Sequence, residues 1–144
     1  MAIYTKFYEN DIKEVLNNYS IGSLNKFEGI QQGIENTNYF LIADNKKYIL
    51  TIYEKRVKEE DLPFFSELMR SLNQSDFKCP VPIVNKKNNS ITQFRNKKLM
   101  IVSFIEGKAK DVLSPENCKS VGTEGAKMHE ITKKFKVKRL NDLS

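Results

Sequence analysis

A short loop that contains glycines and polar side chains offers the clearest chemistry in this sequence. It begins at Gly29, contains Gly33, and ends with the polar residues Asn36, Thr37 and Asn38. Glycine has no Cβ, so backbone N–H groups in such a loop can come close to an anion. The spacing fits neither the dinucleotide fingerprint nor the Walker loop, which needs a Gly-Lys-Ser/Thr ending. The loop therefore predicts either a phosphate-binding site or an ordinary mobile hairpin loop.

The residues on either side of the loop predict antiparallel strands. A short apolar segment ends at Phe27–Gly29, and residues 38–43 and 47–53 alternate in hydrophobicity, with a turn at residues 44–46 between them. Alternation assigns the side chains of the last strand to two faces. One face carries Tyr48, Leu50 and Ile52, and the other carries Ile49, Thr51 and Tyr53. The loop would then connect two strands of a three-stranded unit.

A helix and two more strands are predicted further along the chain. The helix begins near Asp61, a suitable N-cap residue, and has Pro63 in its first turn. Its apolar residues recur at helical spacing and should pack on the sheet: Leu62, Phe65, Met69 and Leu72. Residues 83–94 and 99–104 predict strands joined by residues 95–98, and another helix is predicted at about residues 11–18. After that first helix, the order is three strands, a helix and two strands.

That order is found in the small lobe of protein-kinase-like folds. The strings FEGIQQGIENTNYFL, YILTIYEKRVKEEDLPFF and LMIVSFIEG resemble the N-terminal lobe of homoserine kinases related to aminoglycoside phosphotransferases and choline kinases. The resemblance runs from about the first helix to the chain end. It implies an α+β fold, with a five-stranded antiparallel sheet and one packed helix in a small lobe over residues 1–106. The hinge exit and the first helix of a large lobe would occupy residues 107–144.

The resemblance implies an activity and a set of nucleotide contacts. The family transfers the γ-phosphate of ATP, with Mg²⁺, to the hydroxyl of homoserine on the route to threonine. Its loop covers the phosphates, which places Gly29–Asn38 there. Thr51 stands where fold relatives usually have a phosphate-binding lysine, and Lys55 is either a replacement for it or a solvated strand-end lysine. Glu67 is either the helix glutamate that pairs with the lysine or a solvent-facing residue.

A second set of contacts concerns adenine. Ser103, Phe104 and Ile105, followed by Glu106-Gly107, match the family's hinge between the lobes, where backbone N–H and C=O groups would meet the base. Apolar side chains such as Ile101 or Phe104 would exclude water there. The alternative is a plain edge strand.

The family's catalytic loop is missing from this sequence. That loop contains a histidine, an aspartate and then an asparagine, but His129 is the only histidine here and begins no such run. We therefore assign no catalytic residue and no metal ligand to the chain, and expect the Mg²⁺ ligands in a missing large lobe. The chain is expected to be an inactive amino-terminal fragment. A complete regulatory or pseudoenzyme lobe, or a kinase of another small alcohol of the choline or aminoglycoside type, is the alternative.

Composition limits the remaining possibilities. The chain has 144 residues, is 40% hydrophobic, and contains neither a membrane-spanning run nor a signal peptide, so we expect a cytoplasmic globular protein. Cys79 and Cys118 lack metal-ligand spacing and are expected to be reduced. The net charge of +6 and the basic run over residues 127–139 raise nucleic-acid binding as a rival function. Only Phe135 interleaves with that run, so a solvated helix face explains it better. The oligomeric state is left open.

Overall fold

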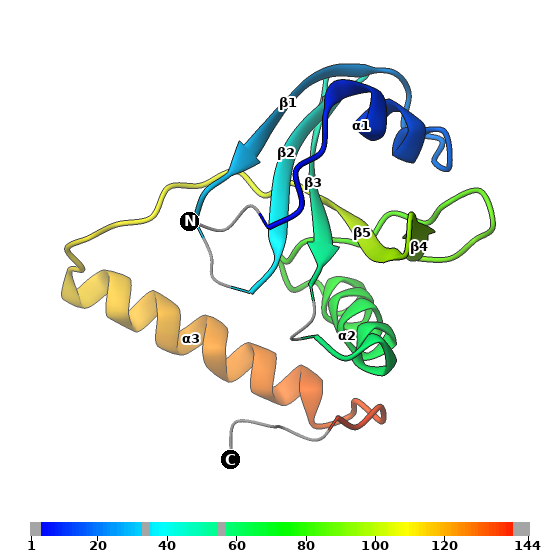
Figure 1. Ribbon diagram of the computed structural model, residues 1–144. Helices are drawn as coiled ribbons and strands as arrows, with labels where there is room; N and C mark the ends of the chain where they lie inside the picture. The colour runs from blue at the N-terminus through cyan, green and yellow to red at the C-terminus, as the bar shows by residue number, and fades with distance from the viewer. Residues whose placement is uncertain (1–3, 33–34, 55–56, 140–144) are drawn as a thin grey trace.

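The computed structural model describes residues 4–32, 35–54 and 57–139, and it contains one mixed helix and sheet unit (Figure 1). The helices are α1 (Glu9–Leu16), α2 (Leu62–Gln74) and α3 (Pro115–Thr132), and a 3-10 turn, η1 (Glu59–Asp61), precedes α2. The strands are β1 (Leu24–Ile30), β2 (Thr37–Ala43), β3 (Lys46–Tyr53), β4 (Ile91–Phe94) and β5 (Lys97–Ser103). They form an antiparallel sheet in the order β1-β2-β3-β5-β4.

Two tight hairpin turns set the register of the sheet. Asp44 and Asn45, between β2 and β3, have φ angles of 44° and 61°. Arg95 and Asn96, between β4 and β5, have φ angles of 45° and 60°. Two-residue turns with left-handed central residues match the twist of antiparallel strands. Turns form at both predicted places, residues 44–46 and 95–98, but both are shorter than predicted, because β3 already begins at Lys46 and β5 at Lys97.

The strand predicted over residues 83–94 is wrong in its first part. Only Ile91–Phe94 forms a strand, and the segment before it folds into a turn around Asn85. The Asn85 Oδ1 accepts hydrogen bonds from the backbone N–H groups of Lys87 and Asn89, at 2.9 and 3.0 Å. Asn88 has a φ of 58°. An asparagine side chain that satisfies nearby backbone groups competes with strand pairing, which explains the late start of β4.

The main core lies between one face of the sheet and α1. The alternation predicted for the strands is confirmed, because Tyr39, Leu41, Leu50 and Ile52 are buried on this face. The apolar face of α1 covers them with the buried residues Ile12, Val15 and Leu16. Such packing removes most of the apolar surface of the sheet and α1 from water, which is the dominant stabilising contribution to folding.

α2 forms a smaller second layer. Leu62 and Leu72 from the predicted apolar stripe are buried, while Phe65 and Met69 are half-buried. Asp61 takes the N-cap position as predicted, but its side chain makes no cap hydrogen bond. The Asp61 carboxylate instead binds the segment after α3, because its Oδ2 accepts a hydrogen bond from Arg139 Nε at 2.8 Å. Within the described part of the chain, no helix has the length and apolar character needed to cross a membrane.

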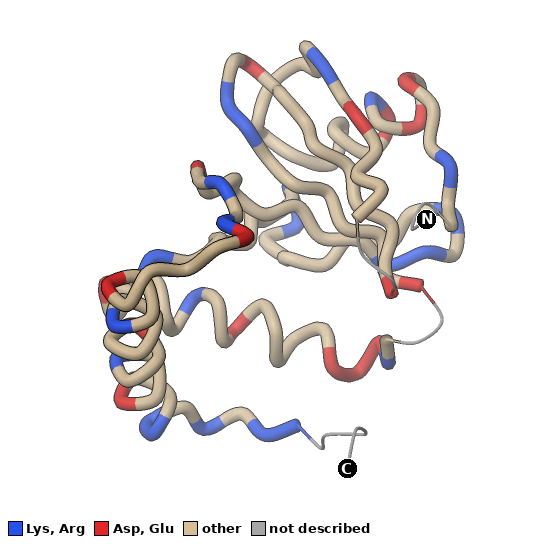
Figure 2. Tube along the Cα trace, turned by 90° about the vertical axis from the view of Figure 1, so that its left-hand side faces the viewer, with Lys and Arg blue, Asp and Glu red and all other residues tan. Residues whose placement is uncertain are grey.

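α3 differs from the other helices because none of its residues is buried. Ser114 caps its first turn, accepting a hydrogen bond from the Asn117 backbone N–H at 3.2 Å. Val121 and Met128 mark an apolar face of α3 that is open to solvent, because Val121 is 66% exposed and Met128 is 36% exposed. Figures 1 and 2 show α3 beside α2 and apart from the sheet, reached by an extended segment after β5.

Candidate nucleotide site

The sheet face opposite α1 carries several of the predicted nucleotide contacts. Antiparallel pairing places Asn38 across from Thr51 and Phe40 across from Ile49 on this face. All four side chains are half-buried, in contrast to the fully covered residues between them. A sheet face that keeps partial access to water can accept a ligand without rearranging the core.

The loop end is polar and ordered by hydrogen bonds. The Thr51 hydroxyl donates to the Asn38 side-chain oxygen at 2.8 Å, which fixes both side chains on the open face. The Asn36 side-chain oxygen accepts from the backbone N–H of Glu54 at 3.3 Å. The structure thus brings Asn36, Asn38 and Thr51 together near the exit of the loop. Their contact with phosphate stays a prediction, as do the contacts of Gly29, which lies in β1.

Thr37 points to the other side of the sheet and is fully buried. Its hydroxyl donates to Glu54 Oε1 at 2.8 Å and accepts from the backbone N–H groups of Tyr4 and Thr5, each at 3.0 Å. A hydroxyl can donate one hydrogen bond and accept two, so the hydrogen-bonding capacity of the Thr37 hydroxyl is fully used. Contact of this hydroxyl with phosphate would require one of these bonds to break.

The hinge end of the face is aromatic. The rings of Phe40 and Phe104 meet edge to face, with centroids 5.3 Å apart. The backbone N–H of Phe104 donates to the Lys47 carbonyl at 3.2 Å, and the Lys47 ammonium lies 5.7 Å from the centre of the Phe104 ring. Lys47 also pairs with Glu106. The sequence reasoning missed Phe40, although strand alternation placed it between Asn38 and Ile42 on the face opposite the core.

The remaining hinge residues are anchored to the segment before β4. Ser103 Oγ accepts from the backbone N–H of Val81 at 2.9 Å, and the Ser103 N–H donates to the Val81 carbonyl at 2.9 Å. Ile105 is half-buried and follows β5 directly. This pairing restrains the predicted hinge as it leaves the sheet. Its hydrogen bonding to adenine stays a prediction.

The loop end and the hinge end are separated by a length of strand. Thr37 pairs with Ile52, whereas Ser103 pairs with Tyr48, four residues back along β3. At a rise of about 3.3 Å per residue, that separation is roughly 13 Å along the face. An extended ligand with an apolar ring system at one end and an anionic group at the other would match this polarity.

The predicted lysine and glutamate pair is not part of this arrangement as described. Lys55 and Gly33 lie outside the described residues. Glu67 is on the exposed side of α2. An ion pair that the sequence did not predict joins Lys97 Nζ to Glu54 Oε2 at 2.7 Å, next to the loop exit. The sequence offered one indication of this ion pair: Glu54 is a charged residue that directly follows the predicted third strand.

Glu54 and Tyr53, at this end of the sheet, both have pKa values shifted from their ordinary values. Burial raises the pKa of Glu54, but hydrogen bonds from Lys97, Thr5 and Thr37 outweigh burial, so its pKa lies below the ordinary value. Burial raises the pKa of Tyr53 to about 12, and its hydroxyl lies 3.9 Å from the sulfur of Met100. Glu54 is therefore charged and Tyr53 neutral at pH 7.

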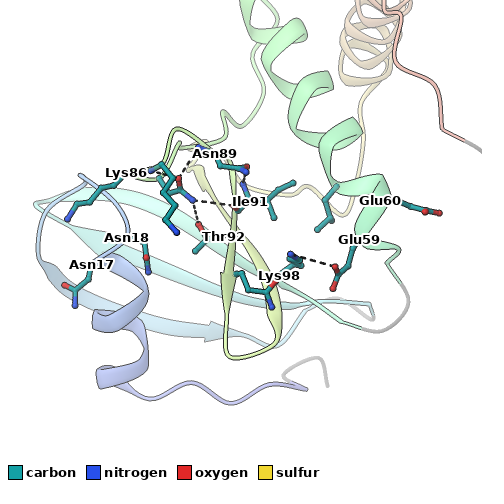
Figure 3. A pocket seen from close by; sticks show the side chains of 13 residues that line it. Asn17, Asn18, Glu59, Glu60, Lys86, Asn89, Ile91, Thr92 and Lys98 are labelled. Atoms are coloured by element: carbon teal, nitrogen blue, oxygen red, sulfur yellow. Dashed lines mark hydrogen bonds and ion pairs between the residues drawn. The ribbon is translucent and has the colours of Figure 1, made fainter.

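A separate polar pocket of about 650 Å³ lies near the β4 edge, lined by the end of α1, η1, the turn around Asn85 and β4 (Figure 3). None of the described residues of the predicted loop or hinge lines it. Several of its side chains are engaged within the fold. Asn85 Nδ2 donates to the Thr92 hydroxyl at 3.0 Å, and that hydroxyl lies 2.7 Å from the Tyr19 hydroxyl. These bonds give the pocket wall a structural role.

The basic run over residues 127–139, which spans the end of α3 and the segment after it, also contacts the rest of the protein. Figure 2 shows this segment running along α2. Arg139 binds Asp61 and lies 5.1 Å from the ring centre of Phe65. Lys127 Nζ donates to the Asp76 carbonyl at 2.8 Å, and the Phe135 ring meets Phe64 with centroids 5.6 Å apart. These contacts hold the segment against α2. They support its interpretation as a structural surface.

Comparison with known proteins decides the family. The model of the phosphotransferase enzyme family matches residues 26–140. The chain belongs to this family. The homoserine kinases of Beijerinckia indica and Bartonella tribocorum are each 40% identical to it, over 99% and 100% of this chain. Those matches cover only 44% and 45% of the relatives, so the chain spans less than half of their length.

Solved phosphotransferases have the same fold. A spectinomycin phosphotransferase in complex with ADP and spectinomycin matches 93% of this chain and 43% of its own, with a TM-score of 0.70 and 16% identity. A microcompartment-associated aminopropanol kinase matches 92% of this chain and 44% of its own, with a TM-score of 0.71 and 13% identity. At these identities the likeness shows the fold alone. The predicted kinase-like N-terminal lobe is confirmed.

Proposed function

We propose that this phosphotransferase chain is the nucleotide-binding lobe of an ATP-dependent homoserine kinase. The observation that carries the proposal is the polarity of the open sheet face, with Asn38 and Thr51 at one end and Phe40 and Phe104 at the other. The homoserine kinase names of the relatives supply the acceptor. In this proposal residues 1–106 form the small lobe, and residues 107–144 leave the hinge and begin a helical lobe.

Each end of the face has a separate task in this proposal. Adenine would lie against the aromatic pair, where apolar contact excludes water and the backbone of Ser103–Ile105 supplies hydrogen bonds. The triphosphate would extend toward the loop exit, where backbone N–H groups and the Asn36 and Asn38 side chains stabilise negative charge. Phosphoryl transfer depends mainly on such positioning and electrostatic stabilisation. The lobe would therefore orient ATP, while the acceptor and its general base belong to the remainder of the enzyme.

Kinases of this general fold use Mg²⁺ to neutralise the phosphates. Mg²⁺ prefers carboxylate oxygens in near-octahedral geometry. Among the residues described here, no three Asp, Glu, His or Cys side chains gather into such a group. The proposal assigns no metal ligand to this chain and no step through the metal.

Nucleotide binding by the 144-residue chain tests the proposal. We expect calorimetric titration with Mg·ADP to show binding that Phe104→Ala weakens by about tenfold, because the base loses an aromatic wall. Phe135→Ala is the matched control, since it also removes one ring of a half-buried edge-to-face pair, but beside α2. Equal effects of the two substitutions, or no binding by the unaltered chain, would count against the proposal.

A second experiment tests whether the chain supports phosphoryl transfer. The chain would be mixed with the separately prepared remainder of the Beijerinckia indica homoserine kinase, and phosphorus NMR would follow transfer from Mg·ATP to homoserine, choline or an aminoglycoside. We expect phosphohomoserine only in the mixture and no product from the chain alone. Absence of product from the mixture would count against the proposed role of the chain as the nucleotide-binding lobe of a kinase.

A further inference from the structure

Glu54 stands at a junction of four chain segments. It follows β3 directly, and its side chain is only 11% exposed. One carboxylate oxygen, Oε1, accepts from the Thr5 hydroxyl at 2.6 Å and the Thr37 hydroxyl at 2.8 Å. The other, Oε2, accepts from Lys97 Nζ at 2.7 Å. A single carboxylate thus ties the N-terminal segment, the start of β2 and the start of β5 to the end of β3.

The backbone around Glu54 extends this junction to the loop exit. The Glu54 N–H donates to the Asn36 side chain, and the Thr37 hydroxyl accepts from the backbone N–H groups of Tyr4 and Thr5. Tyr39 makes a second connection between β2 and the N-terminal segment. Its hydroxyl donates to the Thr5 carbonyl at 3.0 Å and accepts from the Phe7 N–H at 2.7 Å. Residues 36–39 are therefore held against residues 4–7 through side-chain bonds.

The strength of this junction comes from its burial and charge. Hydrogen bonds to an ionised group are about twice as strong as neutral ones, and a buried hydroxyl that loses its partner is costly. Lys97 compensates the charge, so removal of the carboxylate would leave both the ammonium and the Thr37 hydroxyl without their main partner. Among the described residues, the Thr51 to Asn38 bond is the one comparable fixed contact of the loop exit on the open face.

We infer that Glu54 is a positioning residue, which locks the exit of the phosphate-covering loop at residues 36–38 to the N-terminal segment. Its part in nucleotide affinity rests on the proposed function. The lock itself is a property of the ligand-free protein. The N-terminal residues ahead of α1 thereby become part of the machinery that shapes the loop, although they lie on the far side of the sheet from the proposed nucleotide.

Amide hydrogen exchange in the ligand-free chain tests the lock. In Glu54→Gln we expect roughly tenfold or greater acceleration in the peptides that cover residues 4–8 and 35–40, without change in the peptides of α2. Glu14→Gln is the matched control, because Glu14 also pairs with a cation, Arg95 at 2.8 Å, but on the exposed side of α1. Equal exchange in the two variants would overturn the inference.

A second pair of variants keeps the test decisive if Glu54→Gln does not fold. Thr37→Ser retains the hydroxyl and should exchange like the unaltered chain, whereas Thr37→Val keeps the shape but loses the hydroxyl and should exchange faster. Fast exchange in both, or in neither, would overturn the inference.

Calorimetry with Mg·ADP separates the inference from the proposed function. We expect Glu54→Gln to weaken ADP binding by about tenfold, while Glu14→Gln leaves it unchanged. A loosened exit with unchanged ADP affinity would overturn the positioning role. Failure of the unaltered chain to bind ADP would count against the proposed function, and the exchange data would still decide whether the lock exists.

Discussion

The sheet with α1 and the helix α3 are stabilised in different ways. On the sheet, Leu41, Leu50 and Ile101 are fully buried, and α1 covers them with a continuous apolar face. In α3, not one residue is buried, and the helix is held by its Ser114 cap, by backbone bonds and by contacts with α2 and the segment after it. The sheet unit thus contains its own core, whereas α3 has an apolar face without one.

This difference bears on the proposed function. The features that would bind the nucleotide are on the sheet and its hinge, so they depend on the well-packed region. Helical stability in proteins comes mostly from packing of an apolar face, so α3 should open more easily than the sheet. A change that unfolds α3 should therefore leave nucleotide binding by the sheet unaffected.

The largest expected effect comes from cavity formation in the sheet core. Leu50→Ala should lower the free energy of unfolding by about 2–5 kcal/mol, because it removes buried methyl groups and leaves a cavity. Leu113→Ala is the matched control, since Leu113 lies in the segment before α3 and is 56% exposed. Urea titration of both variants measures the difference. Similar losses would contradict the separation between the two regions.

Acid should weaken the sheet unit next. Hydrogen bonding from the Tyr8 backbone lowers the pKa of Asp11, helped by Arg95, and the bonds described above lower the pKa of Glu54. A folded-state pKa below the unfolded value stabilises the protein above the unfolded value, and that stability is lost as pH falls. We expect the urea midpoint to drop from about pH 4.5 downward.

The Glu54→Gln variant provides the control for this pH dependence. It should have a lower urea midpoint at pH 7 and a smaller further loss on acidification, because one of the two carboxylates is gone. A pH profile parallel to that of the unaltered chain would show that Glu54 does not contribute.

A smaller and local effect is expected at the start of α3. Ser114→Ala removes the cap of this helix, which costs about 1 kcal/mol. Because no residue of α3 is fully buried, the loss should appear as faster exchange in residues 115–120, with the urea midpoint of the sheet unchanged. Ser114→Asp, which retains a capping oxygen, should restore protection. A shift of the sheet midpoint would mean that α3 and the sheet unfold together.

The smallest effect is expected on the apolar face of α3. Val121→Ala shortens a side chain that is 66% exposed, so the free energy of unfolding should change by no more than about 0.5 kcal/mol. The same truncation at the buried Val15 in α1 should cost several times more. Thermal unfolding of the two variants compares the regions directly. A large loss at Val121 would show that this face is covered in solution.

Much of the sheet was predictable because its signals are local. The alternation in β2 and β3 assigned Leu50 and Ile52 to the core face, and the Asp44-Asn45 pair indicated the hairpin turn. The segment before β4 was not predictable in this way, because Asn85 bonds to residues two and four positions further on and turns the chain. Its apolar pattern alone resembles that of a strand.

The candidate site was harder to predict than the fold. The loop and hinge could be located from the family resemblance, but the Phe40 to Phe104 contact joins residues that are 64 positions apart in the sequence. The burial of Thr37 and the role of Glu54 depend on the path of residues 4–7, which no local pattern specifies. The sequence therefore did not predict the contacts between side chains that are far apart along the chain.

The order of the strands has a consequence for how the protein behaves at high concentration. β1 and β4 are the two edges of the sheet, and an unprotected edge can pair with the edge of another molecule and start aggregation. β1 carries the exposed charges of Lys26 and Glu28, and β4 is only four residues long. Both edges are thus poor templates for a growing fibril, so aggregation of this chain should begin at the apolar side of α3.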